Sequence, residues 1–73
     1  MMWVYRTSIG LLQIIKAPDG ICYFKFDDDD TYWTGHRDPQ VVADDVHSHV
    51  TGCTEWDDAD IDGPNDLSEW NVV

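Results

Sequence analysis

One stretch of the chain, residues 38–52, carries the signals of an amphipathic helix from its start to its end. Asp38 suits the N-cap position, because its carboxylate can accept hydrogen bonds from the free amides of the first turn, and Pro39 suits the first helical position. Gly52 suits the left-handed residue that closes a helix. The apolar residues between them form one stripe, at Val42, Ala43, Val46 and Val50. We therefore predict a helix over residues 39–51, with one face that a sheet or another helix must cover.

The residues before this helix alternate between apolar segments and turn signals. Gly10 interrupts the first apolar segment, so this segment is either one long strand with a bulge at Gly10 or two short strands. The sequence Ala-Pro-Asp-Gly at residues 17–20 is a strong turn signal, and four consecutive aspartates form the next turn. Between these turns, Cys22, Phe24 and Phe26 share one face of a strand. We predict strands within residues 2–16, 21–26 and 31–34.

These elements predict one small α+β domain over residues 1–73. An antiparallel three-stranded meander would pack against the helix in two layers. After the helix we predict an acidic loop over residues 57–65 and a helical turn over residues 66–70. Leu67 and Trp70 would anchor this turn to the core. The pattern does not say which face of the sheet the helix covers.

Charge divides the chain unevenly, with fifteen acidic residues against four basic ones and a net charge of −11. Three of the four cations, Arg6, Lys16 and Lys25, precede residue 27. Such a chain repels phosphate backbones, so we do not expect direct nucleic-acid binding. The charge instead favours solubility and partners with a basic surface.

The sequence also bears on the compartment. No window of about 18 apolar residues exists, so we expect no membrane span. The start, Met1 to Arg6, lacks a basic segment followed by an apolar one, so we expect no signal peptide and a cytoplasmic location. Cys22 and Cys53 could pair, but in that compartment we expect both to be reduced.

Protein interaction is the leading functional hypothesis. The acidic surface would dock on a basic partner, with Trp33 or Trp56 as exposed anchors, because buried aromatics dominate interface energies. One variant is mimicry of nucleic acid, in which carboxylates stand in for phosphates. If the uncovered sheet face carries several aromatic side chains, a protein partner or a homodimer is expected in place of a monomer. The candidate binding residues are Trp33, Trp56, Asp27, Asp28, Asp29 and Asp30.

A calcium site is the second hypothesis. Residues 58–69 fit the pattern D-x-D-x-D-G-x5-E of an EF-hand calcium loop. Asp58, Asp60 and Asp62 would supply side-chain oxygens, and Glu69 a bidentate carboxylate. The pattern departs from that loop at its seventh and eighth positions, which are Pro and Asn. An acidic loop followed by a capped turn explains the same residues, so we favour no metal over calcium.

Zinc binding and catalysis are less well supported by the pattern. His47, His49 and Cys53 are too few for a closed tetrahedral zinc site, and the two histidines face different sides of a helix. Cys53, His49 and Asp45 could in principle form a nucleophilic triad, but a domain of this size has little room for a substrate pocket. We therefore expect that the protein is not an enzyme.

The chain resembles a group of small uncharacterised bacterial proteins. The likeness rests on Ile9-Gly10, Pro39 with Ala43-Asp44-Asp45-Val46, Thr51-Gly52, Glu55-Trp56-Asp57 and Asp66-Leu67-Ser68-Glu69-Trp70. It covers most of the chain and implies a short protein, but no activity that can be transferred.

A second likeness is one of element order only. Three strands and a Gly-x-x-x-Pro entry into an Ala-containing helix, here from Gly35 to Pro39, are similar to the DNA-binding modules of integrases and plant AP2-type factors. That likeness implies nucleic-acid binding through the sheet, where this chain offers Arg6, Tyr23, Lys25 and Trp33. The acidic tail departs from those modules, so this hypothesis ranks third.

Overall fold

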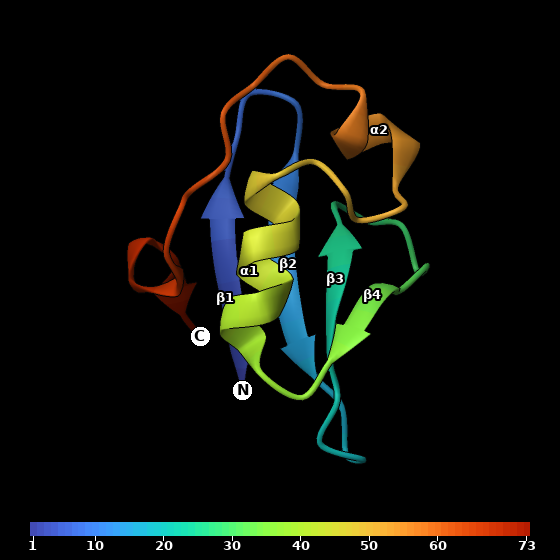
Figure 1. The fold of residues 1–73 in the computed structure, drawn as a ribbon, viewed down its shortest axis with the longest axis vertical. Coiled ribbons are helices and arrows are strands. Elements are labelled where there is room, and N and C mark those ends of the chain that lie inside the picture. Colours follow the sequence, from blue (N-terminus) through green and yellow to red (C-terminus); the bar gives the residue numbers. More distant parts are fainter.

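The apolar first half of the chain forms an antiparallel sheet, and one helix packs across it (Figure 1). The computed structural model describes all residues from 1 to 73. The sheet has the strand order β4-β3-β2-β1-β5. The elements in chain order are β1 (Met2–Arg6), β2 (Leu11–Lys16), β3 (Cys22–Phe26), β4 (Trp33–His36), α1 (Pro39–His47), α2 (Thr54–Asp57), the 3-10 turn η1 (Leu67–Glu69) and β5 (Asn71–Val72).

The prediction of an α+β fold with an antiparallel sheet and one main helix is confirmed, but three strands are an undercount of the five present. Residues 2–16 form two strands, because the chain reverses between Thr7 and Gly10. A Cβ atom at Gly10 would lie 3.1 Å from Cζ of Phe26, so glycine permits this close turn. The fifth strand was missed because its two residues carry no alternating pattern.

The start of α1 follows the prediction, and its end does not. The Asp38 carboxylate accepts from the Gln40 amide at 2.9 Å. The helix ends at His47 rather than at residue 51, because His49 adopts the left-handed conformation (φ 58°) expected for Gly52. The Val50 amide then bonds back to the carbonyl of residue 45 at 3.0 Å, which closes the helix. Val50 is consequently 62% exposed and lies outside the core.

The core lies between α1 and one face of the sheet. Val42, Ala43 and Val46 of α1 are fully buried, as the apolar stripe predicts. They pack with the inward residues of the strands, which include Leu12, Ile14 and Phe24. Trp56 of α2 closes the core at one end, where its indole N–H donates to the Val46 carbonyl at 2.8 Å. The same carbonyl, in the last turn of α1, also accepts from the His49 amide at 3.2 Å, so the indole is its second donor.

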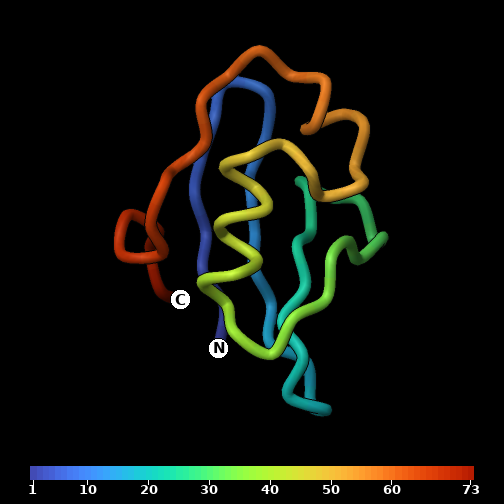
Figure 2. The backbone as a smooth tube through the Cα atoms, in the orientation of Figure 1, coloured from blue at the N-terminus to red at the C-terminus, as the bar shows by residue number.

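The C-terminal segment wraps around the sheet. From α2 it passes over the β1–β2 turn and descends beside β1 (Figure 2). The predicted turn at residues 66–70 is confirmed as η1, and Asp66 caps it by accepting from the Ser68 amide at 2.9 Å. Trp70 is 4% exposed and anchors this segment. None of the helices has the length and apolar character that a membrane crossing would require.

Candidate functional site

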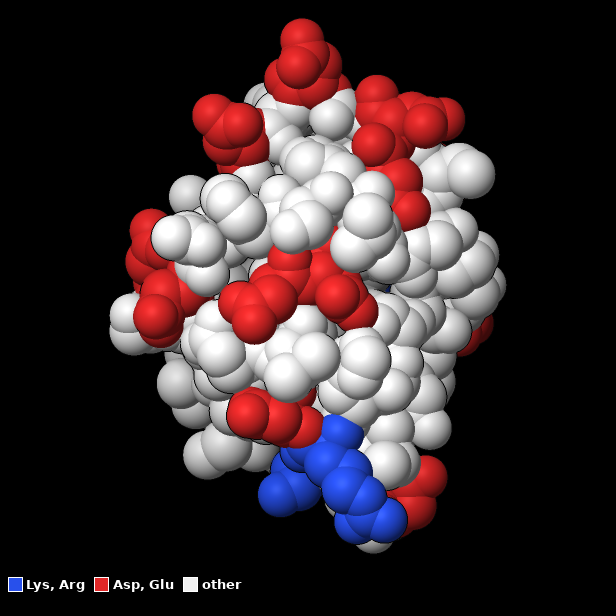
Figure 3. Space-filling model, viewed as in Figure 1, with Lys and Arg blue, Asp and Glu red and all other residues white.

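Acidic and basic residues occupy different parts of the fold. The strands contain Arg6, Lys16 and Lys25 but none of the fifteen acidic residues, which all lie in helices, turns and loops. Acidic side chains are spread over the α1 side of the molecule, and basic ones gather only at its lower end (Figure 3). A partner that approaches the α1 side therefore meets a negative surface.

One groove interrupts this negative surface. It lies between the β1–β2 turn, the end of β3 and the short helix α2, and it has a volume of about 380 Å³. No basic residue lines it. Its lining residues are Ile9, Phe26, Thr54, Glu55, Asp58 and Ala59.

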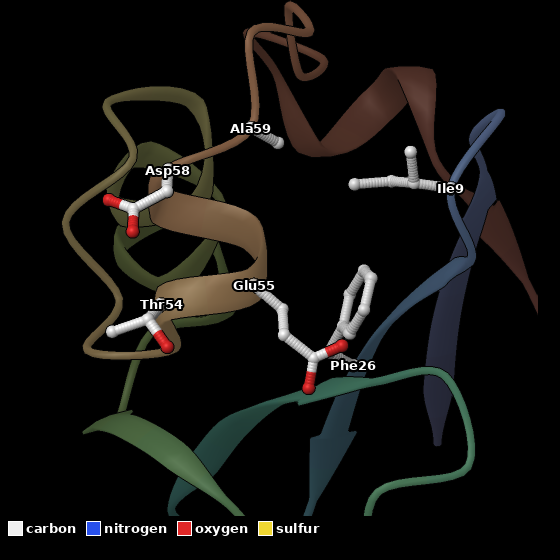
Figure 4. A pocket seen from close by; sticks show the side chains of 6 residues that line it. All are labelled: Ile9, Phe26, Thr54, Glu55, Asp58 and Ala59. Carbon is white, nitrogen blue, oxygen red and sulfur yellow. The ribbon is translucent and has the colours of Figure 1, made fainter.

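The groove is lined by three apolar side chains, and the Glu55 carboxylate lies beside one of them (Figure 4). Ala59 and Ile9 face each other across it, and Glu55 extends toward the ring of Phe26, whereas Asp58 is turned away from that ring. No hydrogen bond within the chain engages the Glu55 carboxylate, which is exposed. A long aliphatic side chain that ends in a cation matches both parts, since such chains bury their stems and keep the charge in water.

Local hydrogen bonds fix the wall that carries Glu55. The Asp57 carboxylate accepts from the amides of Thr51 and Gly52, at 3.0 and 2.8 Å, and from the Thr51 hydroxyl at 2.8 Å. Together with the buried Trp56, these bonds hold α2 against the end of the core. The groove is therefore a feature of packed elements rather than of a loose tail.

The predicted run of aspartates lies at a turn beside this end of the sheet. Residues 27–30 are all exposed. The Asp27 side chain accepts from the Leu11 amide at 3.4 Å, and that of Asp29 from the Thr31 amide at 3.0 Å. This second bond lowers the pKa of Asp29 below its usual value. The run therefore organises its own turn, and it does not gather into one ligand cage.

The two predicted aromatic anchors differ. Trp56 is fully buried, so its prediction as an exposed anchor is wrong. The sequence pattern does not predict the burial of Trp56, because α2 is too short to show an apolar repeat. Trp33 is half-buried and packs beside Gly52, where a Cβ atom would lie 3.3 Å from its ring. The indole N–H of Trp33 is buried and has no hydrogen-bond partner.

The residues of the loop considered as an alternative calcium site do not converge. The Glu69 carboxylate accepts from the amides of Asn65 and Asp66, at 2.8 and 2.9 Å, and so completes a capping box. No three His, Cys, Asp or Glu side chains stand close enough to hold a metal ion. Asp58, Asp60 and Asp62 therefore have no arrangement that suits calcium, and the acidic-loop interpretation fits the structure better.

The residues considered for zinc, which are His47, His49 and Cys53, form no metal-binding group either. His47 Nδ1 lies 3.1 Å from the carbonyl oxygen of Gly63, and His49 Nδ1 lies 2.9 Å from that of Trp56. Since a carbonyl only accepts, each Nδ1 carries the hydrogen in these bonds. Cys22 and Cys53 are free and buried, and burial raises the pKa of both thiols.

The structure also contains a polar cluster that the sequence did not indicate. The Asp45 carboxylate accepts from the Thr34 hydroxyl at 2.6 Å and lies 2.8 Å from Nε2 of His36. Thr34 has a positive φ of 39° at a bulge in the pairing of β3 with β4. The cluster ties β4 to α1, and no cavity adjoins it. The sequence did not predict this cluster, because a threonine in a strand indicates regular pairing and not a bulge.

Comparisons with protein-family models, curated proteins and solved structures found no match to this chain. The two resemblances described above therefore stay predictions.

Proposed function

We propose that this protein is an interaction module that binds a basic segment of a partner protein through the groove between the β1–β2 turn and α2. The observation that carries the proposal is the groove's composition: an apolar lining of Phe26, Ile9 and Ala59, carboxylates of Glu55 and Asp58, and no cation.

The groove would receive one lysine or arginine side chain. Its aliphatic stem would lie against Phe26 and Ala59, and its charged end would reach Glu55. An exposed ion pair contributes about 0–1 kcal/mol. Burial of roughly 80 Å² of stem adds about 2 kcal/mol. A single arginine should therefore bind with a Kd of about 10 mM or weaker, and tighter binding requires further contacts along a longer segment.

The net charge of −11 would act at longer range. It raises the encounter rate with a basic partner and makes binding sensitive to salt. The groove would then determine where the basic partner binds, while the surrounding acidic residues would attract it.

An NMR titration of backbone amides tests the proposal. The probes are N-acetyl-arginine amide, a pentapeptide with two arginines, and the same pentapeptide with norleucine in place of arginine. We expect shifts at Ile9, Phe26 and Glu55 with the arginine probes, reduced by salt. Equal binding of the norleucine peptide, or shifts spread over all acidic turns without the groove, would contradict the proposal.

Two variants localise the effect. Glu55→Gln should weaken arginine-peptide binding about threefold, in line with one exposed ion pair. Asp44→Asn is the matched control, because it removes the same charge from the exposed side of α1, and an asparagine can still accept from the Gln40 amide group. Ala59→Trp should fill the groove and abolish binding. If Asp44→Asn weakens binding as much as Glu55→Gln, the acidic surface binds without the groove.

A further inference from the structure

The face of the sheet opposite α1 is covered by no element of the chain. Because side chains alternate along a strand, the neighbours of the core residues point to this open face. In β1, β2 and β3 these residues are partly buried, except for Gln13, which is 8% exposed, and Arg6, which is exposed. The open sheet face consists of Met2, Val4, Arg6, Leu11, Gln13, Ile15, Tyr23 and Lys25.

An apolar row crosses this face. Met2 pairs with Ile15, Ile15 with Tyr23, and Tyr23 with Gly35. The ring of Tyr23 stacks on Tyr32, with centroids 5.7 Å apart, and Tyr32 is 54% exposed. Gly35 leaves room for the Tyr23 ring, since a Cβ atom there would lie 2.9 Å from Cε1. The row is therefore continuous across four strands.

The open sheet face carries no carboxylate. Its charged residues are Arg6 and Lys25, while every acidic residue of the chain lies outside the strands. For a molecule with a net charge of −11, this is the face on which two copies can meet with the fewest opposing carboxylates. The acids on the far side of α1 lie beyond a helix layer, which exceeds the Debye length of about 8 Å at physiological salt. The nearest acids border the face at its turns, where the Asp27 carboxylate accepts from the Leu11 amide.

Its size also suits a dimer. The molecule measures 32 × 23 × 20 Å, and the sheet lies across its two longer dimensions (Figure 1). These dimensions set an upper limit of roughly 700 Å² on the sheet face, which is of the same order as the ~800 Å² per partner that a stable interface buries.

We propose that two copies of this chain pair through their open sheet faces, with the row of Met2, Ile15 and Tyr23 at the centre. A two-fold arrangement makes the same patch serve both partners and leaves each groove and acidic surface free. A nucleic acid fits this face less well, because two cations neutralise few phosphates on so acidic a chain.

Sedimentation equilibrium of the full chain, from about 10 μM to about 1 mM, tests the pairing, because an interface at the small end of the usual range binds in the micromolar range. We expect a monomer–dimer equilibrium that strengthens at least threefold between about 0.05 and 0.5 M NaCl, since salt screens the repulsion between two anions. Salt has the opposite effect on the groove, so the two proposals fail separately. A monomer at every concentration and salt level overturns the pairing.

Matched variants place the interface. Ile15→Lys should abolish the dimer, although it lowers the net negative charge. Val41→Lys makes the same kind of change on α1, where Val41 is 38% exposed, and should leave the dimer intact. Val4→Lys repeats the test if Ile15→Lys fails to give a dispersed amide spectrum. A dimer that survives both sheet variants overturns the proposal, as does a chain that stays monomeric and binds a twelve-residue thymidine oligonucleotide.

Discussion

The five strands hold three of the chain's four cations and none of its fifteen acidic residues, whereas the helices, turns and tail hold all of the acids. Aspartate is poorly tolerated in strands, and it is favoured in turns because its side chain bonds to nearby amides. The division thus follows from backbone preferences before any function is considered. It leaves the segments around the sheet to carry the negative charge.

Two groups of acidic residues can be compared. In one group, aspartates accept from the amide two residues later and so fix a turn, at Asp19, Asp29, Asp38 and Asp66. In the other group, which includes Glu55 and Asp58, no backbone amide engages the carboxylate, and both residues line the groove. Carboxylates that do no local structural work are the ones available to a partner.

Trp56 lies outside the sheet and is nevertheless part of the core. Among the variants considered, its replacement should lower the free energy of unfolding the most. Trp56→Ala would leave a cavity and would remove one of the two donors to the Val46 carbonyl. We expect a loss of about 3–5 kcal/mol in the free energy of unfolding, measured by urea denaturation. Tyr32→Ala, at an exposed aromatic, should cost less than about 1 kcal/mol. Similar losses for the two variants would mean that α2 is not part of the core.

Variants of His49 test how strongly α1 and α2 are coupled, and we expect smaller losses of stability than for Trp56→Ala. Its ring stacks on Trp56 with centroids 4.6 Å apart, and these contacts offset its left-handed backbone. His49→Ala should cost about 1–2 kcal/mol, because the strain remains and the contacts are lost. His49→Gly should recover about 1 kcal/mol of that loss. If glycine and alanine gave equal stabilities in thermal unfolding, backbone strain at this position would be negligible.

His49 also shows how much of the fold the sequence predicts. The N-cap Asp38, the stripe of Val42, Ala43 and Val46, and the capped turn at Asp66 follow from local rules and are confirmed. The end of α1 depends on a contact with Trp56, which no local pattern reveals. A glycine at the expected closing position is therefore overridden by a tertiary contact.

The candidate site was harder to predict than the fold. Its acidic neighbourhood could be read from composition, but the groove joins Ile9, Phe26 and Glu55 from three distant parts of the chain. Only the packing of α2 against the β1–β2 turn brings them together. The motif that looked most specific, the calcium pattern ending at Glu69, instead describes a capping box, because capping and calcium binding both require carboxylates near a helix start.

The pH dependence of stability distinguishes the acids that fix turns from those at the groove. This is the smallest effect that we expect. The amide of Ser68 lowers the pKa of Asp66 below 3.8 in the folded chain. The stability that Asp66 contributes is therefore fully present above pH 3.8 and is lost as the pH falls through its folded pKa. Asp66→Asn keeps the capping oxygen but cannot titrate there, so its melting temperature should fall less than that of the parent chain between about pH 5 and pH 2.5.

Asp66→Asn has to be compared with the parent chain at each pH. Acid also relieves the repulsion within a chain of net charge −11, and this raises the stability of the variant and of the parent alike. Glu55→Gln is the matched control, since it too removes one carboxylate. The Glu55 carboxylate bonds to no amide, so Glu55→Gln should keep the parent's loss at low pH. If Asp66→Asn and Glu55→Gln gave the same pH profile, the acids that build turns would be indistinguishable from those at the groove, and the division would have no energetic content.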